Sequence, residues 1–417
     1  MREHPSPTWS TPLGYQDYQD YHNQQGLATR SSGRIAVDFD FTPEQDALRA
    51  AVRQMMDREA PEEYLRRLDR DHLFPHELWQ RWVEMDLLAM PFPAHYGGLD
   101  GGVLDFVITA EEIGRKGYDL AGAYGMAVFL GLLVVRHGSP EQAGAIVPGI
   151  IRGERRLSIS ITEPEAGSDA GAMRTYAYAD DGDYVITGQK VFSTGAGLPG
   201  NTILLFARTR RDDRRAISCF LLPNDTPGLS MVRLDTLGRH SMGTFELFLD
   251  DVRVPAANLV GELHGGWEIL VAGLELERTM TCAAYVGNAQ TVVDQALAYA
   301  KEREQFGRPV GDFQAIAHML ADMQTAVDAA RLLTYRAAAL VAQGRPARQE
   351  VAMAKLFGSE TFVDVANKGM QVLGGYSYMM DFPMQRHFRD ARITTVTAGT
   401  SQMQRNQIAR TMGLHPR

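Results

Sequence analysis

The sequence predicts an α+β protein in which a helical N-terminal domain, a small β domain and a C-terminal helical bundle follow one another. Helix patterns broken by Pro and Gly turns run to about residue 157. Short β-branched and aromatic runs come next, and long helical patterns return from Gly266. With 417 residues and 45% hydrophobic content, the chain can bury a large core. We therefore expect domains at residues 37–157, 158–264 and 265–417.

The first 36 residues are polar, with scattered tyrosines, and show neither helical nor strand periodicity. We expect residues 1–36 to form a flexible polar extension. The first helix is expected to begin at Thr42 and Pro43. Thr42 is suited to cap it, Pro43 suits its first turn and Gln45 completes a capping box.

Five runs in the middle of the chain have strand character, and Gly, Asp, Asn and Pro separate them. They span residues 157–162, 184–191, 202–206, 217–222 and 244–249.

Three long helices are expected after Gly266. The second is expected to be capped by Asp312 and to run to about Ala342, and the third spans about residues 348–373. Residues 279–293 carry no charge, so the first helix must be covered on nearly every side, as in the middle of a bundle.

Charge and composition restrict the classes of function. A net charge of −9 without a broad basic region argues against a nucleic-acid partner. The longest apolar runs, such as residues 125–135, are too short and too rich in glycine for a membrane span, and no signal sequence opens the chain. We therefore expect a cytoplasmic protein. Cys219 and Cys282 lack metal-ligand spacing, so we expect two core residues and no metal site.

Two stretches in the β domain are suited to hold a planar or phosphorylated ligand. Residues 161–169 (ITEPEAGSD) leave a strand and enter a loop whose N–H groups and hydroxyls suit a ring or a phosphate. An ordinary polar turn is the alternative. In the second stretch, Phe192 and Thr194 are alternate strand residues and are expected to present a ring and a hydroxyl on one face. Core packing of Phe192 is the alternative.

These two stretches resemble the flavin-binding segments of acyl-CoA dehydrogenases, and further matches follow in the same order over roughly residues 39 to 414. The resemblance implies the acyl-CoA dehydrogenase-like fold with a C-terminal four-helix bundle, an FAD cofactor and a homotetramer. The further matching stretches are Leu237-Gly238-Arg239, Asp251 to Pro255, Arg303 to Gly307, Asp312-Phe313-Gln314, Gln371 to Gly375 and Ala398 to Gln402.

The resemblance also implies which residues contact FAD. The isoalloxazine is expected against Ile161, Thr162, Phe192 and Thr194, with Thr194 near N5. Phe192 departs from the family, where most members have tryptophan. Further FAD contacts, part of them across a subunit boundary, are implied for Gly167, Ser168, Ser193, Arg303, Phe306, Gln314, Gln371, Gly374, Gly375, Thr400 and Gln402.

Removal of the α-proton of a thioester needs a positioned base and donors near the carbonyl oxygen. At the position where most members of the family have this base, this chain has Ala398. Isovaleryl-CoA and long-chain relatives instead place the base on the first bundle helix before an arginine, which implies Glu277 followed by Arg278. Glu275 lies about 200° around the helix from Glu277, so the two carboxylates cannot face one pocket. A solvated Glu277–Arg278 pair is the alternative, which the uncharged run beginning at Thr279 argues against.

The substrate is expected to lie among Ser168, Arg215, Glu275, Arg278, Ala398 and Gly399. The small Ala398 leaves room for a branched acyl group, and its N–H is implied to bind the thioester oxygen. Ser168 is expected to touch the pantetheine. Arg215 is a candidate for the CoA phosphates, with a solvated hairpin tip as the alternative.

The sequence therefore predicts an enzyme that desaturates a short, medium or branched acyl-CoA to the trans-2-enoyl-CoA. Glu277 takes the α-proton, the flavin takes the β-hydride, and electrons pass to electron-transfer flavoprotein or another redox acceptor. Three alternatives remain: an enoyl-CoA reductase working in reverse, a dehydrogenase of carrier-protein-bound acyl groups, and a non-catalytic flavoprotein. The reductase alternative is supported by relatives that act on crotonobetainyl-CoA, which share the Glu-Arg pair of positions 277 and 278 and the phenylalanine of position 192.

Overall fold

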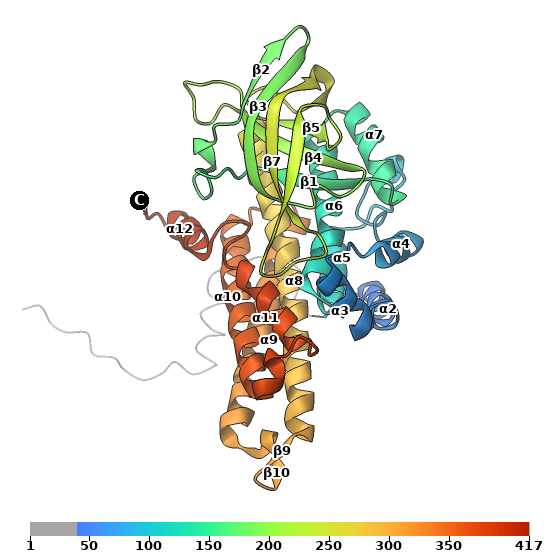
Figure 1. The fold of residues 1–417 in the computed structure, drawn as a ribbon, viewed down its shortest axis with the longest axis vertical. Coiled ribbons are helices and arrows are strands. Elements are labelled where there is room, and N and C mark those ends of the chain that lie inside the picture. Colours follow the sequence, from blue (N-terminus) through green and yellow to red (C-terminus); the bar gives the residue numbers. More distant parts are fainter. Residues whose placement is uncertain (1–39, 417) are drawn as a thin grey trace, which may run out of the picture. The chain divides into compact units, whose positions relative to one another are not determined.

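A computed structural model describes residues 40–416 of the chain, so the expected extension at residues 1–36 lies outside the described residues. The chain divides after Thr42, and all the helices and strands given below belong to the unit that begins at Pro43. Within that unit helices come first, strands follow, and helices return, as Figure 1 shows. The predicted fold class is confirmed.

The N-terminal part of this unit is helical. Its first helix begins at Pro43, as the sequence predicts. A capping box starts α7: the Gln142 backbone N–H donates to the Ser139 hydroxyl at 3.2 Å, and the Ser139 N–H donates to the Gln142 side chain at 3.0 Å. The helices are α2 (Pro43–Glu59), α3 (Glu62–Asp71), α4 (His76–Glu84), α5 (Val103–Gly114), α6 (Tyr118–His137) and α7 (Pro140–Ile151).

Helix α6 is the apolar centre of this part. Among the described residues it alone is long and apolar enough to cross a membrane, by length and composition only. The expectation that no apolar run reaches that length is therefore wrong, because the helix extends beyond residues 125–135 at both ends. Inside the protein, 89% of its most apolar window is buried, with α5, α7, α8 and β1 packed against the helix. Burial on nearly all sides accounts for its composition.

The middle of the chain forms one eight-stranded sheet in the order β6-β7-β3-β2-β4-β5-β8, with β1 paired in parallel to β4. All five predicted runs form strands. Strands β2, β6 and β8 were not predicted, because β2 ends in a charged residue, β6 has no buried residue and β8 has two residues. The strands are β1 (Arg156–Ser160), β2 (Tyr176–Asp180), β3 (Asp183–Thr194), β4 (Asn201–Arg208), β5 (Ile217–Pro223), β6 (Leu229–Leu234), β7 (Thr244–Pro255) and β8 (Leu259–Val260).

The C-terminal part returns to helices, and its third long helix has the bounds that the sequence predicts. The second does not begin as predicted: Asp312 lies in a short 3-10 helix, and Phe313 occupies the cap position of α9 without a side-chain hydrogen bond. The elements are α8 (Gly266–Glu302), β9 (Glu304–Gln305), β10 (Arg308–Pro309), α9 (Gln314–Ala342), α10 (Arg348–Leu373), the 3-10 helix η5 (Gly374–Tyr378), α11 (Met384–Ile393) and α12 (Ser401–Thr411).

Helices α5 and α8 touch through glycine. A Cβ atom at Gly287 of α8 would lie 2.1 Å from the carbonyl oxygen of Glu111, and one at Gly114 of α5 would lie 2.8 Å from Cα of Ala284. Apart from Gln290 and Thr291, all the residues of the uncharged run 279–293 are buried. The run is therefore covered as its composition predicts, and α8 is held against the N-terminal helices.

We predict that Gly287→Ala destabilises the protein by about 1–3 kcal/mol, because the added methyl group forces α8 away from the α5 backbone. Denaturant unfolding of the two proteins measures the difference. Gly144→Ala in α7 is the matched control, since a Cβ atom there meets nothing within 4 Å. It should be neutral or stabilising. An unchanged midpoint for Gly287→Ala would contradict the contact.

Candidate active site

The loop after β1 is anchored by a buried ion pair. The Glu163 carboxylate accepts hydrogen bonds from the Lys190 ammonium at 2.8 Å and from the Thr175 N–H at 2.9 Å. Lys190 is fully buried and also donates to the carbonyl of Ile161 at 2.9 Å. Burial lowers the pKa of Lys190 to about 8, and the charge of Glu163 opposes that shift. Both ends of the pair lie in the flavin-type segments 161–169 and 188–195, so the pair ties them together.

Strand β3 has a bulge where the sequence predicts plain alternation. The pairing register with β7 shifts between Lys190 and Ser193, and Phe192 has a φ of 60°. The bulge interrupts, at Phe192, the regular alternation on which the expected shared face of Phe192 and Thr194 rests. Phe192 is 64% exposed, which also excludes the core-packing alternative. Ser193 is buried, and its hydroxyl lies 2.6 Å from that of Ser160.

The rest of the loop is open at its tip. Thr162 accepts the N–H of Val191 through its carbonyl at 2.9 Å, so the loop continues alongside β3. Gly167 and Ser168 are exposed, and a Cβ atom at Gly167 would meet nothing within 4 Å. The ordinary-turn alternative accounts for the tip but not for the buried anchor at Glu163.

The basic turn between β4 and β5 reaches the end of this loop. Arg214 forms an ion pair with Asp169 and donates to the carbonyl of Gly171. Arg215 is exposed, and its backbone N–H donates to Asp213 at 2.8 Å. Arg214 therefore holds the turn to the loop, while the Arg215 side chain lies at the surface.

Glu277 lies on α8 and is partly buried, and three cations act on its carboxylate: Arg278 of the same helix, Arg239 of the turn between β6 and β7, and Lys355 of α10. Burial raises its pKa, while the charges of Arg278, Arg239 and Lys355 act in the opposite direction. The described structure contains no ion pair between Glu277 and Arg278. Glu275 lies elsewhere, with its carboxylate 3.7 Å from Arg348 at the start of α10.

Arg278 connects α8 to the turn before α12. Its Nε donates to the carbonyl of Ala398 at 2.8 Å, and the Gln404 amide donates to the carbonyl of Gly399 at 2.9 Å. Ala398 and Gly399 both have left-handed backbones, with φ of 52° and 86°. The positive φ of Gly399 is a conformation that favours glycine, and a Cβ atom there would lie 2.9 Å from the Arg278 guanidinium. Arg278, the residue that follows Glu277, thus holds this turn.

Arg239 is a second cation near Glu277, and sequence reasoning noted it only as part of a motif. Its Nε lies 3.2 Å from Asp119, and its guanidinium lies 4.8 Å from the centre of the Tyr118 ring. Burial opposes its charge, but Tyr118 and Asp119 hold the pKa of Arg239 above its usual range. Asp119 also accepts the N–H groups of Ser241 and Met242. A charged residue in the first turn of the apolar α6 was the available signal for Asp119.

Of the remaining predicted FAD residues, one group lies away from Glu277: Arg303, Phe306, Gln314, Gln371, Gly374 and Gly375. Arg303 follows the end of α8, 26 residues after Glu277, which corresponds to about 39 Å along a helix. Figure 1 shows the β9–β10 hairpin beside it at the end of α8 far from the sheet. Phe306 in that hairpin is 94% exposed. Gln314 starts α9, Gln371 ends α10, and Gly374 and Gly375 open η5. Within the described chain, this group and the Phe192 group do not meet.

Thr400 and Gln402 belong to the start of α12. The Thr400 hydroxyl accepts the backbone N–H of Met403 at 3.2 Å and so caps the helix. Gln402 is exposed.

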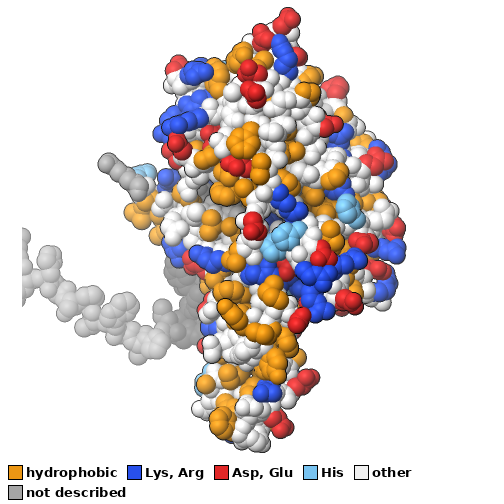
Figure 2. All heavy atoms as spheres, viewed as in Figure 1, with side chains coloured by type: hydrophobic (Ala, Val, Ile, Leu, Met, Phe, Trp, Pro, Cys, Tyr) orange, Lys and Arg blue, Asp and Glu red, His pale blue; other side chains and the backbone are white. Residues whose placement is uncertain are grey.

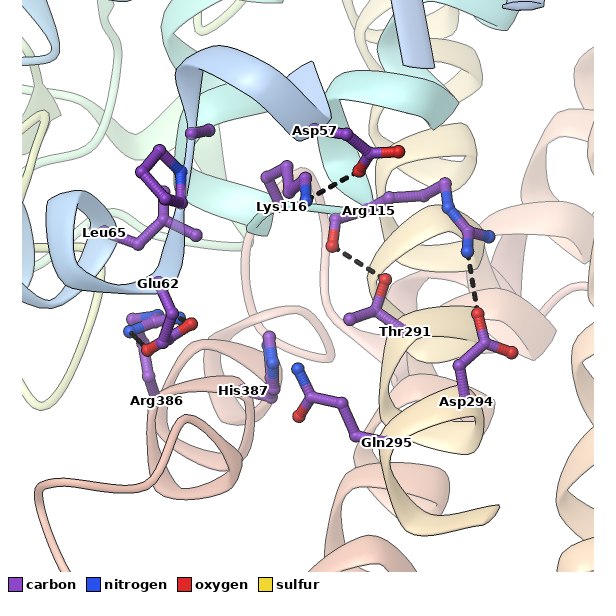
Figure 3. A pocket seen from close by; sticks show the side chains of 12 residues that line it. Asp57, Glu62, Leu65, Arg115, Lys116, Thr291, Asp294, Gln295, Arg386 and His387 are labelled. Carbon is purple, nitrogen blue, oxygen red and sulfur yellow. Dashed lines mark hydrogen bonds and ion pairs between the residues drawn. The ribbon is translucent and has the colours of Figure 1, made fainter. Parts of the chain in front are cut away.

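A separate cavity of about 260 Å³ lies between the N-terminal helices and α8 and α11 (Figure 3). Its charged side chains are paired: Lys116 with Asp57 at 2.7 Å and Arg115 with Asp294 at 2.7 Å. Burial, together with Arg386, lowers the pKa of His387 to about 3, so its ring is neutral. None of the predicted site residues lines this cavity. Among residues 40–416, no group of three or more His, Cys, Asp and Glu is placed to hold a metal ion.

Comparison with known proteins identifies the class of protein that this fold and these residues define. Sequence models of the acyl-CoA dehydrogenase N-terminal, middle and C-terminal domains match residues 42–154, 158–252 and 264–413. The chain belongs to the acyl-CoA dehydrogenase family. It is therefore an oxidoreductase, and the predicted family and enzyme class are confirmed.

The chain matches curated relatives over nearly their whole length. A probable acyl-CoA dehydrogenase of Bacillus subtilis is 37% identical over 90% of this chain and 99% of that protein. Acryloyl-CoA reductase (NADH) of Anaerotignum propionicum is 36% identical over 90% of this chain and 95% of that protein. A caffeyl-CoA reductase-Etf complex subunit of Acetobacterium woodii is 34% identical over 88% of this chain and 98% of that protein.

Solved structures have the same fold. Butyryl-CoA dehydrogenase from Megasphaera elsdenii matches with a TM-score of 0.86 and 30% identity, over 90% of this chain and 100% of that chain. The FAD complex of PigA also matches with a TM-score of 0.86, at 26% identity, over 90% of this chain and 99% of that chain.

We predict that Lys190→Met destabilises the protein by about 3–5 kcal/mol, because it leaves the Glu163 carboxylate without its buried cation. Denaturant unfolding measures this loss. The double variant Glu163→Gln, Lys190→Met should recover part of it, since no buried charge then lacks a partner. If the double variant loses as much stability as Glu163→Gln and Lys190→Met lose together, the two side chains are not coupled.

Proposed function

We propose that this enzyme removes the α-proton of an acyl-CoA with Glu277 and desaturates the acyl chain with FAD. Bound FAD supplies the acceptor for the β-hydride. The cofactor prediction agrees with the family, and an FAD complex is among the matching structures. The observation that carries the proposal is the partly buried Glu277 on α8, whose neighbour in sequence, Arg278, holds the turn at Ala398.

The residues at the bulge of β3 fit a flavin. Phe192 lies near the end of β3 and is 64% exposed, so its aromatic ring is accessible to a planar group that stacks on it. Buried contacts on either side of Phe192 hold the bulge: the Ser193 hydroxyl with that of Ser160, and the Glu163–Lys190 pair. A flat exposed ring on a rigid support suits a large planar cofactor.

Glu277 suits the role of base for a physical reason. A carboxylate near its ordinary pKa is a weak base at neutral pH, and burial raises the pKa of Glu277 toward the range where proton abstraction is efficient. The cations Arg278, Arg239 and Lys355 limit the rise, so the group stays able to ionise. Glu275, turned toward Arg348, has no such surroundings.

The substrate is proposed to be a short, medium or branched acyl-CoA. The side chain of Ala398 is only a methyl group, which leaves space for the acyl chain beside the turn that Arg278 holds. A methylene difference in such a pocket changes binding by only about 1–3 kcal/mol, so several chain lengths are expected to react.

The reverse direction is the second candidate. Two of the relatives are named as reductases, and both are nearly as similar to this chain as the B. subtilis dehydrogenase. The same base works in both directions, since it returns the proton to the α-carbon. Electron-transfer flavoprotein is the proposed redox partner, in keeping with the relative named for an Etf complex. Rates of acyl-CoA oxidation and of enoyl-CoA reduction, measured with that partner, decide the direction.

A homotetramer is proposed as the working assembly. The two groups of predicted FAD residues lie at opposite ends of α8, so one cofactor joins them only between subunits. Figure 2 shows hydrophobic side chains gathered over the lower, helical part of the view. Exposed apolar residues of that part include Phe306, Leu332, Tyr376, Tyr378, Met379 and Met380.

Glu277→Gln keeps the size of the side chain and removes the base. We predict that anaerobic reduction of the flavin by a good acyl-CoA slows by on the order of 10²–10⁴, with FAD content and acyl-CoA affinity retained. Glu275→Gln is the matched control and should change the rate little. A wild-type rate in Glu277→Gln would exclude Glu277 as the base. No reduction of the wild type by any acyl-CoA or carrier-bound thioester would favour a non-catalytic flavoprotein.

Arg303→Ala tests the proposed subunit boundary. Arg303 lies 5.9 Å from the centre of the exposed Tyr376 ring, and a guanidinium is suited to a diphosphate. We predict that the variant loses FAD or dissociates at dilutions where the wild type remains assembled. Sedimentation velocity with flavin absorbance follows both properties. An unchanged assembly with unchanged FAD affinity would remove Arg303 from the cofactor site.

A further inference from the structure

A lysine that acts electrostatically on the candidate base is buried without a hydrogen-bond partner. Lys355 is on α10, which packs along α8, and its side chain is 0% exposed. Its Nζ has no hydrogen-bond partner within residues 40–416. Moving an unpaired ammonium out of water costs several kcal/mol, so packing alone does not account for this residue.

The register of α8 against α10 places Lys355 on the side of α8 just beyond the base. Cys282 of α8 packs with Val351 and Ala354 of α10, and a Cβ atom at Gly358 would lie 3.9 Å from the Tyr285 ring. Lys355 is therefore level with the turn of α8 that holds Arg278 and Cys282. The charged and titratable groups that act on Lys355 are Cys282, Arg278 and Glu277 from α8 and Glu360 from its own helix.

Of the acidic groups around Lys355, Glu277 is the one left to balance its charge. Glu360 is held by Arg405 of α12 through two hydrogen bonds of 2.7 and 2.9 Å. Burial raises the pKa of the Cys282 thiol to about 12, so the thiol is neutral. Burial lowers the pKa of Lys355 to about 8, so below that pH it is a cation.

The other two cations near Glu277 have partners of their own. Arg239 pairs with Asp119 at 3.2 Å, and Arg278 donates to the carbonyl of Ala398 at 2.8 Å. Of the three cations that act on Glu277 in the described structure, Lys355 alone is not engaged by another group.

We propose that Lys355 is a positioning residue that holds the Glu277 carboxylate in its charged, proton-accepting form. This inference rests on the proposed function. The substrate α-proton moves to Glu277, and Lys355 neither gains nor loses a proton in that step. Its ammonium acts only through its field, which is screened less in the protein interior than in water.

The test is the pH profile of flavin reduction in Lys355→Met, measured by stopped flow on the FAD-loaded enzyme with saturating acyl-CoA. Loss of the cation raises the pKa of Glu277, so less carboxylate is present at mildly acidic pH. We expect the acid limb to move to higher pH by about one unit, which is about tenfold in rate on that limb. Above pH 8 the wild-type lysine is itself neutral, so the two rates should converge.

Lys368→Met on the same helix is the matched control. Lys368 is partly exposed, forms an i,i+4 pair with Asp364 at 2.8 Å and is remote from the site, so its profile should follow the wild type. Lys355→Gln is a second neutral variant and should shift the limb as Lys355→Met does. Melting temperature and FAD content are recorded for each protein as readouts of folding.

Several results would overturn the inference. A wild-type acid limb in both Lys355 variants, with Glu277→Gln inactive, would reject the role of Lys355 and keep the base. Equal slowing at every pH with a lower melting temperature would assign Lys355 to structure alone, as would loss of FAD from both variants. A wild-type rate in Glu277→Gln would instead reject the proposed function itself.

Discussion

Helices α5 and α8 approach so closely at Gly114 and Gly287 that neither position has room for a methyl group. This contact fixes α8, and α8 carries Glu277 and Arg278 near one end and leads into Arg303 at the other. On the α5 side, the buried carboxylate of Glu111 accepts Arg331 of α9 at 2.9 Å, which adds a polar link between the N-terminal helices and the bundle. Helix α8 packs against both the N-terminal helices and the C-terminal bundle. It therefore positions Glu277 and Arg278 near one end and Arg303 at the other.

Electrostatics around Glu277 depends on which cations have other partners. Arg239 is held by Asp119 and Tyr118, and Arg278 is held by a main-chain carbonyl. Such pairs keep their geometry whether or not Glu277 is charged. A cation without a partner responds to the charge state of its neighbour, which is why groups of equal formal charge have different effects at one carboxylate.

The sequence was sufficient for elements with strong periodicity. The uncharged run of α8 predicted its burial, and the helical pattern at about residues 348–373 predicted the bounds of α10. The bulge at Phe192 could not be predicted, because strand alternation assumes a regular ladder and the register shift arises from pairing with β7. The Glu163–Lys190 pair joins residues 27 apart, and the neighbours of Lys355 come from another helix, so only tertiary packing brings these groups together.

The clamp on the turn before α12 has a consequence for how this family diversifies. Arg278 and Gln404 grip the main-chain oxygens of Ala398 and Gly399, not the side chain at 398. The turn can therefore keep its path while the residue at 398 changes, provided that residue accepts a left-handed backbone. With the candidate base on α8 instead of the turn, drift at position 398 reshapes the adjoining space without removing the group that moves the proton. Specificity and chemistry are then free to evolve on separate elements.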